Sequence, residues 1–113
     1  MSNTFSNELS PAETERLAML AEECGEVVQI VGKILRHGYE SKHPNGGPTN
    51  REQLERELGD VEAVKKMMIA GFDVRENEVI GHCGSKLTKV LQWLHHQKRL
   101  MGKMGIVVDS ERT

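Results

Sequence analysis

Apolar residues recur every three or four positions along three long stretches of the chain, a spacing typical of amphipathic α-helices. Start and stop signals place the predicted helices at about 11–37, 50–70 and 75–100. The first two ranges each follow a capping-box pattern, in which Ser10 or Thr49 precedes a glutamate by three positions. Each of these two ranges also ends before a glycine, which favours helix termination.

These elements predict an all-α fold. Three helices joined by short loops favour an antiparallel bundle, and the length of 113 residues suits a single domain over 1–113, with a loose tail from about 102. One tryptophan, one tyrosine and two phenylalanines are few for a β-sandwich or barrel. The apolar stripes of the first two helices are broader than two neighbouring helices easily cover. We therefore expect oligomerisation to complete the bundle.

Acidic residues lie inside these two apolar stripes. On a helical wheel Glu23 falls within the apolar arc of the first helix, and Glu26 lies at its edge. Glu57 and Asp60 both project between apolar positions of the second helix. Residues three positions apart are neighbours on a helix, so each helix presents an acid pair. Facing carboxylates repel one another unless a cation compensates them, and an all-oxygen ligand set favours a hard ion such as Mg²⁺.

Each acid pair taken alone has an ordinary interpretation. Glutamate is common in helices, and acids at the edge of a stripe usually reach solvent or pair with lysine or arginine. A non-enzymatic helical module, for protein interaction or for nucleotide binding without hydrolysis, also explains amphipathic helices. It does not explain acid pairs inside both apolar arcs.

The same residues carry a family resemblance. EECGE at 22–26, followed by ELGD at 57–60, resembles the EExxE…ExxD signature of the MazG-like, all-α nucleoside triphosphate pyrophosphatases. The resemblance implies a MazG-like helical fold, assembled as a homodimer or homotetramer. It also implies cleavage of ribo- or deoxyribonucleoside triphosphates between the α and β phosphates, which gives a monophosphate and pyrophosphate. The ligands that it implies for Mg²⁺, or for Mn²⁺ as a substitute, are Glu23, Glu26, Glu57 and Asp60. Glu22 and Glu23 are then the candidate catalytic residues, with Glu22 as an outer ligand or as a group that orients the attacking water.

The chain departs from the family pattern in two places. A loop rich in glycine and proline, at 39–48, makes the gap between the two acidic motifs long. The sequence after Asp60 is more charged than usual and lacks the His-containing stretch of the related phosphoribosyl-ATP pyrophosphatases. For this reason a phosphoribosyl-ATP pyrophosphatase-like activity ranks lower.

Basic and aromatic residues supply candidate substrate contacts. Lys86, Lys89 and Trp93 line one side of the apolar stripe of the third helix, where the lysines could meet phosphates and the indole could stack on a base. The alternative is a core tryptophan beside lysines that extend to solvent. Lys33 is a further phosphate candidate, although lysine is also favourable near a helix C-terminus.

Charge and composition narrow the partners. The formal net charge of −2, from 15 basic and 17 acidic residues, gives no general attraction to nucleic-acid polymers or anionic membranes. No apolar run approaches membrane-spanning length, and the first ten residues lack the apolar core of a signal peptide. Two isolated cysteines suit a reducing compartment. We expect a cytoplasmic protein whose partners are a nucleotide and further copies of itself.

Overall fold

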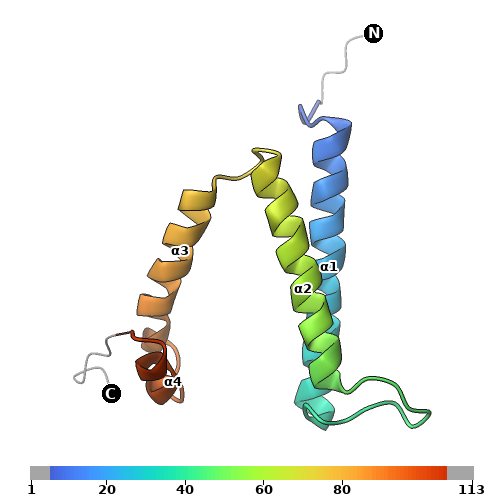
Figure 1. The fold of residues 1–113 in the computed structure, drawn as a ribbon, viewed down its shortest axis with the longest axis vertical. Coiled ribbons are helices and arrows are strands. Elements are labelled where there is room, and N and C mark those ends of the chain that lie inside the picture. Colours follow the sequence, from blue (N-terminus) through green and yellow to red (C-terminus); the bar gives the residue numbers. More distant parts are fainter. Residues whose placement is uncertain (1–5, 107–113) are drawn as a thin grey trace. The chain divides into compact units, whose positions relative to one another are not determined.

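The computed structural model describes residues 6–106, and every named element in that range is a helix (Figure 1). The elements, in chain order, are α1 (Pro11–His37), α2 (Asn50–Ala70), α3 (Glu76–Lys89), the 3₁₀-helix η1 (Val90–Gln92) and α4 (Lys98–Lys103). Among the described residues, β-pairing is limited to one isolated bridge between Lys42 and Thr49. The all-α prediction is confirmed. Within that part of the chain, no helix is both long and apolar enough to cross a membrane.

The bounds of α1 and α2 coincide with the predicted ranges because both capping boxes form. Ser10 Oγ accepts from the Glu13 backbone N–H at 3.1 Å, and Glu13 Oε1 accepts from the Ser10 N–H at 2.8 Å. Thr49 and Glu52 make the same reciprocal pair at 3.1 Å each. These bonds satisfy amide groups that the first turn of a helix cannot pair internally.

The chain divides into two compact units, Met1–Asp73 and Val74–Thr113. The single-domain expectation stays a prediction. In the first unit, α1 and α2 pack as an antiparallel helical hairpin, the blue-to-teal and green helices of Figure 1. Its buried apolar side chains are Ile30, Val64 and Met68. At the loop end, the buried Asn50 side-chain amide donates to the Gly38 carbonyl oxygen at 3.0 Å, which ties the start of α2 to the end of α1.

At the opposite end of the hairpin, an ion pair joins α1 to the residues that follow α2. Arg16 donates from Nε to Asp73 Oδ2 at 2.6 Å and from a terminal nitrogen to Oδ1 at 2.8 Å. Gly71 lies against this guanidinium, since a Cβ placed on it would be 2.8 Å from Arg16 Cζ. The absence of a side chain at position 71 therefore leaves room for the bidentate pair.

We expect Gly71→Ala to lower the melting temperature, because the added methyl group pushes Arg16 away from Asp73. Gly59→Ala is the matched control in α2, where a Cβ would meet nothing within 4 Å. That control should stabilise the protein by about 0.5–1 kcal/mol, the usual gain of alanine over glycine inside a helix. Thermal unfolding followed by circular dichroism measures both variants. Equal stability of the two variants would contradict the proposed role of Gly71.

The second unit corrects the prediction of one helix over 75–100. α3 ends at Lys89, the chain tightens into η1, and a separate short helix begins only at Lys98. The Trp93 N–H bonds to the Val90 carbonyl oxygen at 3.0 Å, an i→i+3 bond that replaces the α-helical pattern. The break precedes Trp-Leu-His-His, in which the tryptophan and histidines have poorer helix propensity than alanine. The break also precedes Met101 of α4, which is buried. The tail predicted to be loose from 102 is still helical to Lys103, and 107–113 lie outside the described residues.

Candidate metal centre

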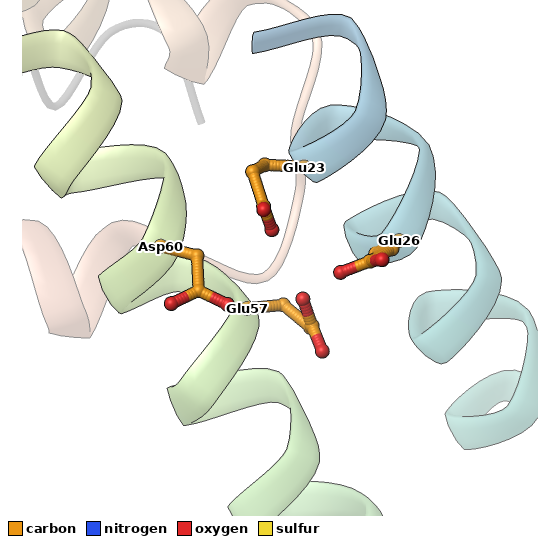
Figure 2. Close-up of side chains that lie close together, drawn as sticks. All are labelled: Glu23, Glu26, Glu57 and Asp60. Carbon is orange, nitrogen blue, oxygen red and sulfur yellow. The ribbon is translucent and has the colours of Figure 1, made fainter. Parts of the chain in front are cut away.

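Two carboxylate pairs meet between α1 and α2. The helical turn places Glu23 and Glu26 on the side of α1 that faces α2, and it places Glu57 and Asp60 on the facing side of α2 (Figure 2). One oxygen from each of the four side chains lies within 4.8 Å of the others. The sequence prediction that these four acids converge agrees with this geometry. We call these four residues the carboxylate quartet.

Two oxygens of the carboxylate quartet are buried without a partner. Glu23 Oε2 and Glu57 Oε2 are inaccessible to solvent, and neither accepts a hydrogen bond within the described structure. The Glu23, Glu26 and Glu57 residues are half-buried, whereas Asp60 is exposed. Buried carboxylate oxygens are normally hydrogen-bonded or bound to a cation, because losing water without a replacement is costly. Two such oxygens in one acidic cluster are expected where carboxylates bind a cation.

The electrostatics of the carboxylate quartet are repulsive. The pKa of Glu57 is raised to about 7, first by hydrogen bonding with the Glu26 carboxyl, which requires that one of the two acids is protonated. Burial and the charges of Glu26, Asp60 and Glu23 raise this pKa further. The pKa of Glu23 is also raised, first by burial and then by the charges of Glu26 and Asp60. All leading causes raise the pKa, and within the described residues neither Glu23 nor Glu57 forms an ion pair with lysine or arginine, in contrast to the ordinary interpretation of surface glutamates.

The donor set fits a hard divalent cation. Mg²⁺ binds oxygen at about 2.0–2.1 Å in octahedral geometry, which puts opposite ligands about 4.2 Å apart. Four oxygens within 4.8 Å of one another need only small side-chain rotations to share one such ion. If each of the four residues supplied one oxygen, the remaining positions would be open to water and phosphate.

The structure places several other candidate site residues outside the carboxylate quartet. Glu22 is exposed and outside the carboxylate quartet, although its charge contributes to the raised pKa of Glu23. Its catalytic role stays a prediction. Lys86, Lys89 and Trp93 belong to the second unit, and their assignment to a substrate wall stays a prediction as well.

Packing within the second unit leaves Trp93 73% exposed, so that unit does not make it a core tryptophan. We therefore expect Trp93→Ala to change the free energy of unfolding by no more than about 0.5 kcal/mol, as for most surface substitutions. If the indole stacks on a base, the variant should raise KM for the nucleotide while the melting temperature stays the same. A collapse of the melting temperature with an unchanged KM would instead restore the core interpretation.

A hollow of about 260 Å³ opens beside the carboxylate quartet. Its lining consists of Glu26, Gln29, Ile30, Lys33, Gln53 and Glu57. Lys33 was a candidate from the sequence, and it is the candidate substrate residue that the structure places next to the acids. Gln29 and Gln53 were not identified from the sequence. The signal that could have identified them is their spacing from the acids. Gln29 follows Glu26 by three residues and Gln53 precedes Glu57 by four, so each glutamine lies on the same helix face as the acid.

The likeness to the MazG-like enzymes is carried by the acidic motifs at 22–26 and 57–60, which the hairpin brings together. Membership of that family stays a prediction that rests on these motifs. Comparison of the chain with protein-family models, with curated proteins and with solved structures found no match.

Proposed function

We propose that this chain is a Mg²⁺-dependent, MazG-like nucleotide pyrophosphohydrolase that converts nucleoside triphosphates, ribo or deoxy, to the monophosphate and pyrophosphate. The observation that carries the proposal is the carboxylate quartet, with two buried oxygens that accept no hydrogen bond within the described structure. Structural acids in a helical hairpin pair with basic side chains or reach solvent, and these two oxygens do neither. The carboxylate quartet supports a cation site, and the motif resemblance supports the hydrolysis of nucleoside triphosphates at that site. The cytoplasmic location belongs to the same proposal.

The proposed reaction requires the protein to position the cation, the phosphates and the attacking water, and to supply negative charge that binds the cation. When bound, Mg²⁺ lowers the pKa of water and neutralises the phosphate chain. The residues that would hold the cation, from two helices, are Glu23, Glu26, Glu57 and Asp60, and their position would determine where the phosphates bind. Glu22, one residue from the carboxylate quartet and open to solvent, is suited to orient the incoming water. This route forms no covalent intermediate, so the chain needs no serine or cysteine nucleophile.

A screen of all common nucleoside triphosphates with Mg²⁺ tests this function directly. Pyrophosphate release should occur with at least one ribo- or deoxyribonucleotide and should stop when the metal is chelated. Calorimetry with Mg²⁺ alone serves as the parallel measurement. Mg²⁺ binding without pyrophosphate release from any nucleotide would favour the non-enzymatic module instead. Phosphoribosyl-ATP belongs in the screen because the related pyrophosphatases share the acidic pairs.

We also propose that the chain self-associates through the apolar faces of its first unit. Leu35 is 82% exposed, Val28 71% and Leu58 51%, and the two-helix hairpin leaves further apolar side chains half-covered. Apolar patches of this extent on a soluble chain usually mark an interaction surface. A second copy is the partner that we propose, as a homodimer or as half of a homotetramer.

Light scattering at micromolar concentration should therefore give at least twice the chain mass of 12.7 kDa. Leu35→Glu should shift the mass towards the monomer, because it puts a charge into the apolar face. A monomer mass for the unchanged protein across the micromolar range would refute self-association.

A further inference from the structure

The hollow beside the carboxylate quartet is lined by residues of both α1 and α2. Gln29 lies about 4.5 Å along α1 from Glu26, and Gln53 lies about 6 Å along α2 from Glu57, at the rise of 1.5 Å per residue. Because the helices are antiparallel, both displacements run towards the loop end of the hairpin. The two carboxamides therefore stand one helical turn beyond the acids, one on each helix. Because Glu26 and Glu57 belong to both the lining and the carboxylate quartet, a group that fills the hollow lies next to any ligand that the quartet holds.

Apart from Glu26 and Glu57, which the proposed function assigns to the cation, the lining offers few groups that would hold a phosphate directly. Among the described residues that line it, Glu26 and Glu57 are acidic and Lys33 alone is basic. Phosphate sites are built from arginine, lysine and backbone N–H groups that donate without accepting. A carboxamide presents one donor group and one acceptor side by side. This lining suits an uncharged ligand whose edge carries both donors and acceptors.

The size of the hollow and its one apolar lining residue favour a ligand group that contains a ring. Complete small-molecule pockets usually measure about 300–1,000 Å³, so about 260 Å³ accommodates one end of a nucleotide rather than all of it. Ile30, which is 3% exposed, contributes a small apolar contact to an otherwise polar lining. A nucleobase combines an apolar face with a polar edge, and glutamine side chains read such edges by paired hydrogen bonds.

We propose that Gln29 and Gln53 select the nucleobase, so that the hollow holds the base while the carboxylate quartet holds the phosphates through the metal. This inference rests on the proposed function, since it takes the ligand to be a nucleotide. The two carboxamides are specificity-determining residues, and their loss should flatten the preference among bases without disturbing the metal.

Binding of nucleoside monophosphates to the full-length, Mg²⁺-loaded protein tests the assignment without turnover. Calorimetry should give the unchanged protein different affinities for the adenine, guanine, cytosine and uracil monophosphates. Gln29→Met and Gln53→Met keep the length of the side chain but remove its donor and acceptor. Each should weaken binding of the preferred monophosphate by about tenfold, the usual effect of one or two lost hydrogen bonds. The differences in affinity among the four monophosphates should become smaller in both variants.

The controls separate the two proposals. Gln92→Met, in η1 and outside the hollow lining, should leave all affinities unchanged. Affinities for Mg²⁺ alone and for Mg²⁺ with pyrophosphate should be the same in every variant. Weaker pyrophosphate binding in Gln29→Met or Gln53→Met would overturn the assignment in favour of a phosphate subsite, and equal affinities for the four bases in the unchanged protein would overturn it outright. If no nucleotide binds and none is hydrolysed, the proposed function itself fails.

Discussion

Replacing Glu57 with glutamine should abolish pyrophosphate release and leave the helical hairpin folded. Glu57 contributes one of the two buried carboxylate oxygens that accept no hydrogen bond in the described structure, and this oxygen makes Glu57 a proposed ligand. Its loss should weaken Mg²⁺ binding by at least about tenfold, since even partners that only orient a ligand are worth 10–100-fold in metal affinity. The metal-free variant should melt at a higher temperature than the metal-free parent at neutral pH, because one repelling charge is gone.

Glu55→Gln is the matched control for this experiment. Glu55 is an exposed glutamate on the same helix and lies outside the carboxylate quartet. It should retain turnover and Mg²⁺ affinity, which would exclude a general effect of lowering the negative charge. Calorimetry, pyrophosphate release and thermal melts on the three proteins give a complete comparison. A Glu57→Gln protein with normal turnover and normal Mg²⁺ affinity would remove Glu57 from the site.

The extent of α1 and α2 was predictable because local chemistry determines it. Both capping boxes and both terminating glycines are readable from residues within a few positions of each helix end. The end of α3 was not predictable in the same way. The apolar stripe continues past Lys89, so periodicity alone extends the helix, whereas the 3₁₀ turn at Val90 breaks it. Periodicity gives the phase of a helix more securely than its length.

The carboxylate quartet was predictable because the apolar stripe of each helix shows which side meets its neighbour. An acid pair inside that stripe must then point at the other helix, and consecutive antiparallel helices bring two such pairs together. Gln29 and Gln53 escaped detection because neutral polar residues at the edge of a stripe are usually solvated. Recognising them required the register between α1 and α2, which no single-helix pattern contains.

Without metal, the protein should lose stability as the pH rises from about 4.5 to about 7. The carboxyl of Glu57 has an ordinary pKa of 4.5 and a folded pKa of about 7, and the pKa of Glu23 is raised as well. Between these values the folded chain binds more protons than the unfolded chain. The free energy of unfolding therefore falls with increasing pH through this window. The stabilisation is complete below pH 4.5 and is lost above pH 7.

Other acids with shifted pKa values act outside this window. The pKa of Asp73 is lowered from 3.8 by its hydrogen bond to Arg16, and the capping glutamates Glu13 and Glu52 are lowered from 4.5 by their serine and threonine partners. Their contributions are present above those ordinary values and are lost only as the pH falls below them. The slope between pH 4.5 and 7 therefore reports on Glu23 and Glu57.

Adding Mg²⁺ should reverse this slope. Cation binding requires deprotonated carboxylates, so its stabilising effect grows as the pH rises through the same window. Thermal melts at a series of pH values, with saturating Mg²⁺ and with a chelator, should diverge most at pH 7 and above and converge towards pH 4.5. Glu57→Gln should show a shallower slope without metal and little response to Mg²⁺. Parallel curves with and without Mg²⁺ would mean that the four carboxylates do not share a cation, because only a ligand that competes with protons for them links the two titrations.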